Sequence, residues 1–162
     1  MPKNNDKTNV MRILDGKKIR YTAHTYEPDA AMSGEEIAAL LGEDAGQVFK
    51  TLVTQGKSGQ YYVFVVPVKA GLDLKKAAKA AGEKAIRMIR QKELLPLTGY
   101  VHGGCSPIGM KKQFRTFLHE TAKQCDRMFV SAGKVGFQIE LSPQDLVSAA
   151  GCGFADITEE RV

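Results

Sequence analysis

Two apolar segments flanking a polar turn constrain the fold of this chain most strongly. Residues 48–54 and 60–67 are rich in valine and aromatic side chains, and Gly56-Lys57-Ser58-Gly59 separates them. Segments of this kind around a glycine-containing turn predict a β-hairpin. Such a hairpin must bury at least one apolar face, so the rest of the chain has to supply a covering layer.

Lys50 interrupts the first of these segments. Burying its ammonium group would be costly, because the charge loses its hydration. Its side chain can instead lie at a strand edge with the charged end in water, where it also discourages aggregation. The functional alternative is a cation in a pocket that holds a phosphate or a carbonyl oxygen. The sequence alone leaves both interpretations open.

A glycine-rich segment later in the chain suggests a second part of the same pocket. Gly103-Gly104-Cys105-Ser106-Pro107-Ile108-Gly109 contains three glycines within seven residues. Glycine lets the backbone approach a ligand closely and present N–H groups to an anion or a carbonyl oxygen. Ser106 is either a nucleophile or, as its place before Pro107 equally suggests, a structural hydroxyl in a turn.

The remaining pattern mixes helices and strands without regular βαβ alternation. Strands are expected at 19–27, 48–54, 60–67, 85–89, 128–131, 135–141 and 154–157, and residues 114–118 fit either a strand or a helix. Helices are expected at 10–14, 34–41, 74–81 and 143–150, with a short helical turn at 93–97; Ser33, Asp73 and Ser142 are the expected caps. We therefore expect a mixed α/β fold: one domain over residues 1–162 with a largely antiparallel, barrel-like sheet flanked by helices.

Composition restricts the class of protein. The chain has 162 residues, a formal net charge of +5 and 43% hydrophobic residues, which is typical of a soluble globular domain. No apolar run approaches the roughly 20 residues that span a bilayer, and residues 1–7 lack a secretory signal, so no membrane contact and a cytoplasmic location are expected. Cys105, Cys125 and Cys152 are odd in number and far apart, which favours free thiols.

Several kinds of site lack their sequence signatures. The chain has no Walker loop, no dinucleotide-binding glycine motif and no nucleophile elbow. His24, His102 and His119 are widely separated, so we expect neither a metal nor a cofactor. His102 and Cys105 suggest a cysteine nucleophile only weakly, and we interpret Cys105 as a small buried apolar side chain.

Basic residues cluster in two places. One set comprises Lys75, Lys76, Lys79, Lys84 and Arg87; a second comprises Lys111, Lys112 and Arg115, directly after the glycine-rich segment. Each set is either a solvated face or a contact for nucleic-acid phosphates. The chain has no tryptophan and no aromatic ladder, so stacking of single-stranded bases is not indicated.

Motifs along almost the whole chain resemble the YbaK/EbsC family. They are Phe49-Lys50-Thr51-Leu52, Leu72-Asp73-Leu74-Lys75-Lys76-Ala77-Ala78, Thr98-Gly99-Tyr100 with the glycine-rich segment, and Val130-Ser131-Ala132-Gly133-Lys134. Proteins of this family are Cys-tRNA(Pro) deacylases related to the editing domain of bacterial prolyl-tRNA synthetases. The resemblance implies editing in trans of mischarged tRNA(Pro), with prolyl-tRNA synthetase as a partner and a monomer or weak homodimer.

The resemblance also implies positions for the site. Lys50 and Gly103 are the expected catalytic residues, and Lys75, Lys76, Lys79, Lys111 and Lys112 are expected at the tRNA backbone. The expected substrate-binding residues are Tyr26, Ser33, Thr51, Ser131 and Gln138. Ser33 replaces an aromatic residue of better-known members, and Gln138 replaces an acidic one. These changes alter the size and polarity of the pocket.

The mechanism implied by the resemblance is assisted by the substrate. The cysteine sulfur of the substrate attacks its own ester carbonyl, and a cyclic thiolactone is released. Two alternatives remain: a deacylase that removes alanine or serine by water attack, and a non-catalytic module that binds a synthetase or has a regulatory role. The identity of the released product, and turnover at low protein concentration, distinguish the three.

Overall fold

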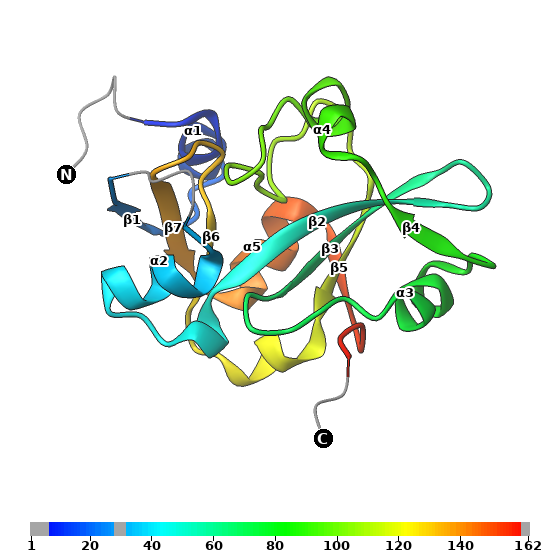
Figure 1. Ribbon diagram of the computed structural model, residues 1–162. Helices are drawn as coiled ribbons and strands as arrows, with labels where there is room; N and C mark the ends of the chain where they lie inside the picture. The colour runs from blue at the N-terminus through cyan, green and yellow to red at the C-terminus, as the bar shows by residue number, and fades with distance from the viewer. Residues whose placement is uncertain (1–6, 28–31, 160–162) are drawn as a thin grey trace.

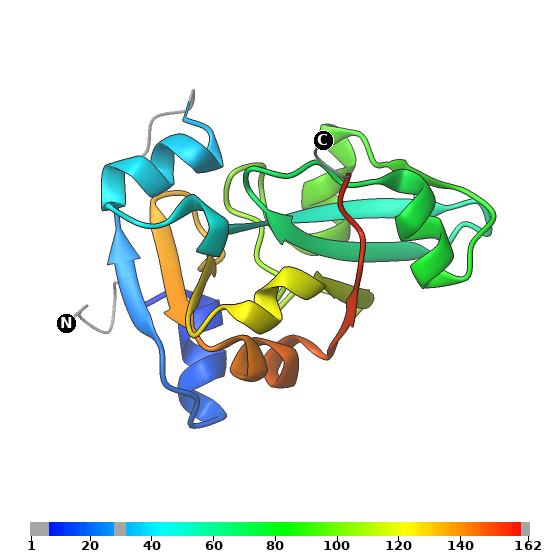
Figure 2. The same cartoon turned by 90° about the horizontal axis from the view of Figure 1, so that it is seen from below.

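Two β-sheets form the centre of the molecule. In the computed structural model, which describes residues 7–27 and 32–159, five strands pair in the order β4-β2-β3-β5-β8 and three in the order β1-β7-β6 (Figures 1 and 2). The strands are β1 (Thr22–Thr25), β2 (Phe49–Gly56), β3 (Tyr61–Pro67), β4 (Ile86–Met88), β5 (Arg115–His119), β6 (Met128–Ser131), β7 (Phe137–Leu141) and β8 (Cys152–Ala155). The hairpin of β2 and β3 is as predicted, with Lys50 opposite Val66.

The helices begin and end close to their predicted signals. They are α1 (Asn9–Gly16), α2 (Gly34–Leu41), α3 (Leu74–Ala81), α4 (Gln91–Thr98) and α5 (Pro143–Ala150), with short 3-10 helices η2 (Ala45–Gln47) and η3 (Glu120–Gln124). Ser33 closes a capping box at the start of α2, and Gly42 ends that helix in the left-handed conformation. No helix within the described ranges has the length and apolarity needed to cross a membrane.

The mixed α/β class is confirmed, but the strands in the described ranges do not close into the barrel-like sheet that the sequence suggested. The described strands form two separate sheets, joined only by an isolated parallel bridge between Val48 and Phe129. Four of the strand pairs are antiparallel, whereas β3–β5 and β5–β8 are parallel. Two long connections after β3 and β5 make these parallel pairs possible, since parallel neighbours need crossovers.

Three segments differ from their predicted extents. The first strand is only Thr22–Thr25 and not 19–27, because only these residues pair with β7. The helical turn at 93–97 is the longer helix α4, which accommodates Pro96 near its end. The ambiguous segment 114–118 is strand β5, which lies between β3 and β8 in the larger sheet.

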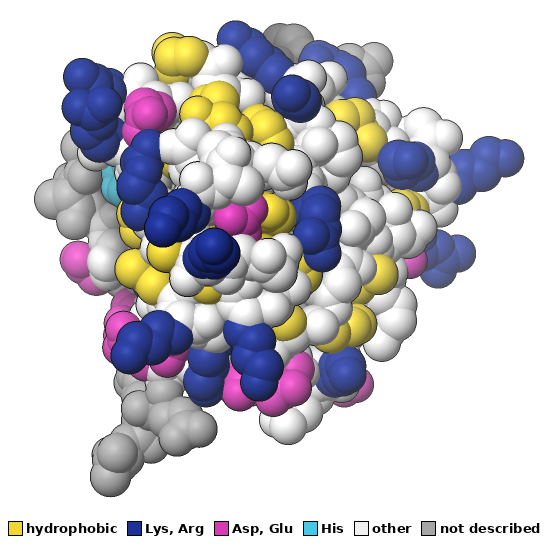
Figure 3. Space-filling view, turned by 90° about the vertical axis from the view of Figure 1, so that its right-hand side faces the viewer, with side chains coloured by type: hydrophobic (Ala, Val, Ile, Leu, Met, Phe, Trp, Pro, Cys, Tyr) yellow, Lys and Arg dark blue, Asp and Glu magenta, His cyan; other side chains and the backbone are white. Residues whose placement is uncertain are grey.

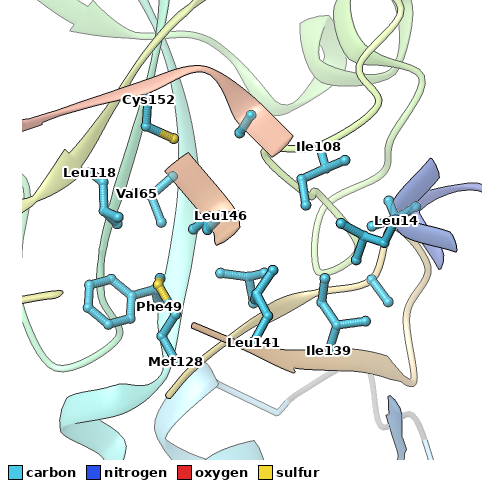
Figure 4. Packing of buried hydrophobic residues seen from close by; sticks show 14 of the residues in the cluster. Leu14, Phe49, Val65, Ile108, Leu118, Met128, Ile139, Leu141, Leu146 and Cys152 are labelled. Atoms are coloured by element: carbon cyan, nitrogen blue, oxygen red, sulfur yellow. The ribbon is translucent and has the colours of Figure 1, made fainter. Parts of the chain in front are cut away.

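One apolar core spans both sheets and fixes their relative position. Phe49, Val65 and Leu118 extend from the larger sheet toward Met128, Ile139 and Leu141 of the smaller one, with Leu146 of α5 between them (Figure 4). Burying side chains of this size stabilises the fold by about 1.5–3 kcal/mol each. These contacts hold the two sheets together, and the candidate site lies beside the seam between them.

The turn between β6 and β7 packs closely against α1, and a glycine in that turn makes the close contact possible. Gly133 has φ +94°, and an added Cβ would lie 2.9 Å from Val10 Cγ2 and 3.0 Å from Tyr100 Cε1. Gly59 has almost the same φ, +96°, with nothing within 4 Å of an added Cβ. We predict that Gly59→Ala costs only backbone strain of about 1–2 kcal/mol. Gly133→Ala should cost roughly 1–3 kcal/mol more through overpacking.

Urea denaturation of both variants measures the difference. Equal losses of unfolding free energy would mean that α1 does not press on this turn.

Candidate active site

One cavity of about 270 Å³ contains every predicted catalytic and substrate-binding residue. It lies between α2, the first half of β2, the start of β7 and the glycine-rich loop. Ligand cavities commonly measure about 300–1,000 Å³, so this one is at the small end of the range. The residues are Tyr26, Ser33, Lys50, Thr51, Gly103, Ser131 and Gln138.

Strand β2 supplies Lys50 and Thr51 from a stretch that pairs with another strand on one side only. β3 pairs with β2 along its length, whereas β4 pairs with it only from Thr54 to Gly56. Lys50 is half-buried at this edge and lines the cavity. The strand-edge and pocket interpretations of Lys50 are therefore compatible, because the strand edge on which it lies is also a wall of the cavity.

The glycine-rich loop forms another wall through Gly103. This residue has φ +86°, a left-handed conformation that favours glycine, and the nearest atom to an added Cβ would be Val135 Cγ2 at 3.7 Å. The need for glycine here follows from the backbone conformation and not from crowding by the protein. Gly104 is the crowded neighbour, since its added Cβ would meet Val135 N at 3.0 Å.

The smaller sheet presents one cross-strand row to the cavity. Gln138 on β7 lies opposite His24 on β1 and opposite Ser131 on β6. Directly opposite residues share a face of the sheet, which is why Gln138 and Ser131 both reach the cavity. Ser131 Oγ also accepts a hydrogen bond from Gly133 N at 3.1 Å. Tyr26 lines the cavity just beyond β1, held by a backbone hydrogen bond to Gly136 O.

Ser33 contributes to the cavity from the start of α2. Its Oγ accepts a hydrogen bond from Glu36 N at 3.1 Å, so the hydroxyl is already engaged in the helix cap. At this position Ser33 therefore supplies a small side chain more than a polar group.

An ion-pair network lies beside this row on the same face of the sheet. His24 Nε2 lies 2.8 Å from Glu140 Oε1, and Arg127 Nε lies 3.4 Å from Glu140 Oε2. The hydrogen bond from His24, with a further contribution from Arg127, lowers the pKa of Glu140. Glu140 is thus a paired anion of the sheet. It does not line the cavity.

Glu43 is the residue near the site that the sequence did not reveal. Both of its carboxylate oxygens are buried without a geometrically complete hydrogen bond among the described residues. Burial raises the pKa of Glu43, while contact with the Gln138 side chain and the charge of His24 oppose that shift in part. Nothing in the sequence marks a glutamate after a helix-ending glycine, because its burial depends on how α2 lies over β7.

The apolar walls were also missed as parts of the site. Ile37 was predicted only as a helix residue, and Leu94 only as part of a short turn; both line the cavity. Met32, Val68, Val130 and Phe137 do so as well. Apolar side chains at helix or strand spacing carry no signal that separates a cavity wall from ordinary core.

The potential nucleophiles differ in position. Cys105 and His102 line the cavity, but burial raises the pKa of the Cys105 thiol to about 12, which leaves it protonated at neutral pH. Ser106 is fully buried, and its Oγ accepts a hydrogen bond from Ile108 N at 3.3 Å. Ser106 is therefore the structural hydroxyl of the two alternatives.

The predicted tRNA-contacting lysines lie in two separate regions. Lys75, Lys76 and Lys79 belong to α3, which is at the opposite end of the larger sheet from α2 (Figures 1 and 2). Lys76 Nζ contacts the Asp156 carboxylate at 3.1–3.2 Å and Thr158 O at 3.0 Å. Lys111 and Lys112 are exposed in the loop that continues from the glycine-rich segment. Among the described residues, no group of three or more His, Cys, Asp or Glu side chains is placed to hold a metal ion.

Comparison with known proteins identifies the class of this fold and cavity. The family model of the aminoacyl-tRNA editing domain matches residues 27–149, and the chain belongs to that family. A protein of Enterococcus faecalis named as a candidate Cys-tRNA(Pro)/Cys-tRNA(Cys) deacylase, EbsC, is 46% identical over 160 residues, covering 98% of both chains. YwhH of Bacillus subtilis is 30% identical over 112 residues, 69% of this chain and 71% of its own.

Solved structures have the same fold. The crystal structure of the protein APE2540 superposes with a TM-score of 0.86 at 25% identity, covering 94% of this chain and all of that one. A structure described as a candidate trans-editing enzyme for prolyl-tRNA synthetase gives a TM-score of 0.79 at 26% identity, covering 94% and 99%. The mixed α/β fold expected from the sequence is thus that of known editing proteins.

The raised pKa of Cys105 predicts that its thiol reacts slowly with alkylating reagents. At pH 8 we expect iodoacetamide to alkylate Cys105 in the native protein at least ~100-fold more slowly than a free cysteine, because a pKa near 12 leaves far less thiolate than the ordinary value of about 8.5. The rate should still rise between pH 9 and pH 10.

Mass spectrometry of the alkylated peptides, with the denatured protein as the control, measures this difference. Alkylation at the rate of a free thiol would contradict the assignment of Cys105 as a protonated wall residue.

Proposed function

We propose that this chain, as one editing domain over residues 1–162, deacylates Cys-tRNA(Pro) in trans, with Cys-tRNA(Cys) as a second substrate. The observation that carries the proposal is the convergence of Lys50, Thr51, Gly103, Ser131 and Gln138 on one small cavity in a member of the editing family. The name of the relative from Enterococcus faecalis supports the choice of substrate.

The size of the cavity suits the end of an aminoacyl-tRNA. A volume near 270 Å³ accommodates a small aminoacyl group, and the rest of the nucleic acid must remain outside. Ile37, Val48 and Leu94 provide apolar walls for a cysteine side chain. A side chain as small as Ser33 at the start of α2 leaves the entrance open to the terminal ribose.

The reaction can proceed without a nucleophile from the protein. The substrate sulfur forms a bond with the ester carbonyl carbon, the bond from that carbon to the ribose oxygen breaks, and the thiol proton ends on the ribose hydroxyl. Cyclic thiolactone and free tRNA result. Because both reacting groups belong to one molecule, holding them in a reactive conformer can supply roughly 7–11 kcal/mol. The protonated Cys105 takes no part in this scheme.

Lys50 and Gly103 then stabilise charge. The Lys50 ammonium, on the open edge of β2, binds the terminal phosphate of the tRNA or the negative charge that develops on the carbonyl oxygen. The left-handed turn at Gly103 exposes backbone at another wall of the cavity. In other enzymes the loss of one such donor costs about 3–4 kcal/mol of transition-state stabilisation.

A basic face provides contacts for the body of the tRNA. Residues 57–92 contain nine lysines and arginines but only two acidic residues, Asp73 and Glu83. Figure 3, which views the end of the molecule beyond the β2–β3 turn, shows lysine and arginine side chains spread widely with few acidic ones between them. Lys75 and Lys79 are too far along the sheet for the aminoacyl group, but a tRNA extends that far. Lys76 already contacts Asp156, so we expect it to contribute least.

The cellular context follows from the same proposal. The chain acts in the cytoplasm as a monomer or weak homodimer and works beside prolyl-tRNA synthetase. The solved trans-editing structure supports this assignment of the partner.

A panel of aminoacyl-tRNAs tests the function directly. Purified protein at low concentration should deacylate Cys-tRNA(Pro) and release thiolactone. Release of free alanine or serine from their tRNAs would favour deacylation by water. Absence of turnover on every substrate would leave only a binding role.

Lys50→Ala should reduce deacylation of Cys-tRNA(Pro) about 100-fold or more, because it removes the cation of the β2 wall. Lys50→Arg should not restore the rate, since guanidinium is planar and larger than ammonium. Lys17→Ala, an exposed lysine at the end of α1 outside the basic face, is the matched control. Single-turnover rates and melting temperatures of all three measure the effect. A normal rate in folded Lys50→Ala would exclude this cavity as the active site.

The basic face predicts salt dependence. Lys75→Ala/Lys79→Ala should flatten the log–log plot of tRNA affinity against salt by roughly 0.7–0.9 for each phosphate that the variant no longer neutralises. Alanine suits both positions on α3, so the fold should persist. The preference for Cys-tRNA over Ala-tRNA should not change, because it resides in the cavity. Lys111→Ala/Lys112→Ala gives the same comparison near the glycine-rich loop. An unchanged salt slope in both double variants would contradict the proposed contacts.

A further inference from the structure

Unsatisfied polar atoms occur at two walls of the cavity and directly beside it. Within the described residues, four side chains contain buried oxygens that lack a hydrogen-bond partner: Glu43, Thr51, Thr121 and Gln138. Thr51 and Gln138 line the cavity, and Glu43 contacts Gln138. Leaving one buried polar group unsatisfied costs about 1–3 kcal/mol, so a cluster of them needs an explanation. A ligand that completes their hydrogen bonds would provide one.

The chemistry of the β7 wall indicates a ligand that donates a hydrogen bond. Gln138 is 4% exposed, and its unsatisfied atom is the carbonyl oxygen Oε1. A carboxylate only accepts hydrogen bonds, so Glu43 must face the amide nitrogen of Gln138. That contact orients Oε1 away from Glu43. Gln138 thus lines the cavity with an acceptor that no protein group in the described residues satisfies, and Glu43 places a second acceptor, with negative charge, beside it.

The other charged groups of this sheet already have partners. His24 and Arg127 both contact Glu140, the neighbouring acid on β7. Lys50 lies on β2, a different strand from that of Gln138. The cavity is thus polarised, with a cation on the β2 wall and, on the β7 wall, the acceptor Gln138 beside Glu43, whose charge His24 compensates only in part. The intact aminoacyl ester of a tRNA has the complementary arrangement, because its amino group is cationic and its nucleotide end is anionic.

We propose that the Glu43–Gln138 pair binds the free α-ammonium group of the aminoacyl ester, with Gln138 Oε1 in contact and Glu43 as a positioning residue that orients the amide and supplies charge. The inference rests on the proposed function and adds a selectivity to it. The site accepts aminoacyl-tRNA with an unmodified amine and rejects N-acylated or peptidyl-tRNA. In the latter the nitrogen is neutral and its substituent meets the closed β7 wall.

A titration that does not depend on turnover tests this selectivity. The probes are 3′-deoxy-3′-(alanylamino)adenosine, which resists cleavage, and its N-acetyl form. Wild type should bind the free amine at least tenfold more tightly than the N-acetyl form. Glu43→Gln should reduce that ratio to near one, and Glu43→Asp should restore part of it. Glu35→Gln, an exposed glutamate on α2, is the control and should leave the ratio unchanged.

Kinetics provide a second test. On Cys-tRNA(Pro), Glu43→Gln should raise KM about tenfold with little change in kcat, whereas general damage to the fold would lower kcat as well. N-acetyl-Cys-tRNA(Pro) should be a poor substrate of the wild type and no worse a substrate of the variant.

Thermal unfolding separates binding from a structural role. Burial raises the pKa of Glu43 above its unfolded value, so its ionisation weakens the fold as pH rises through the folded pKa. Glu43→Gln should therefore unfold at a higher temperature than wild type at pH 8, with the difference vanishing near pH 4. A lower unfolding temperature at pH 8 would make Glu43 a structural residue and overturn the inference.

The outcomes distinguish this inference from the proposed function. If wild type deacylates Cys-tRNA(Pro) but binds both probes equally, the inference fails and the function stands. If wild type deacylates nothing yet prefers the free amine through Glu43, the function fails and the amine site stands.

Discussion

The bridge between the start of β2 and strand β6 is the constraint on which the rest of the structure depends. Val48 bridges to Phe129, and Ala38 of α2 packs against both, which ties the larger sheet to the smaller one and to the helix above them. The short strand β4 pairs with β2 only from Thr54 to Gly56, so it does not cover the β2 edge at Lys50. Val48, Lys50 and Thr51 all line the cavity, so the stretch of backbone that joins the two sheets also forms a wall of the site.

Local signals made most of the fold predictable, whereas relations between distant segments were not. The hairpin at Gly56–Gly59 and the capping box at Ser33 are encoded within a few residues, and both formed as expected. The number of sheets depends on which strands pair across long connections. No local pattern distinguishes a closed barrel from two sheets that meet at one bridge, and the short extent of β1 likewise depends on where β7 ends.

In the candidate site, too, some residues could be predicted from the sequence and others depend on how distant segments pack. The resemblance to a family located seven lining residues, and the structure places all of them around one cavity, although placement does not assign their roles. Lys50 could also be inferred from its cost in an apolar strand. Glu43 could not, because a glutamate after a helix-ending glycine is an ordinary surface residue until α2 is laid over β7. Leu94 gave no signal either, since an apolar residue lining a cavity has the same spacing as one that fills a core.

The protein tolerates unsatisfied groups only where they face the cavity or the residue behind it, with Thr121 as the one exception among the described residues. Glu140 Oε1 lies beside His24 and Glu140 Oε2 beside Arg127, whereas neither oxygen of Glu43 has a complete hydrogen bond among the described residues. A sequence selected for stability alone would place an amide or an apolar side chain at position 43, since a carboxylate whose burial is only partly compensated destabilises the fold. Retaining the carboxylate beside Gln138 is consistent with a cavity whose hydrogen bonding is completed by its substrate, so that part of the binding energy is stored as incomplete contacts in the free protein.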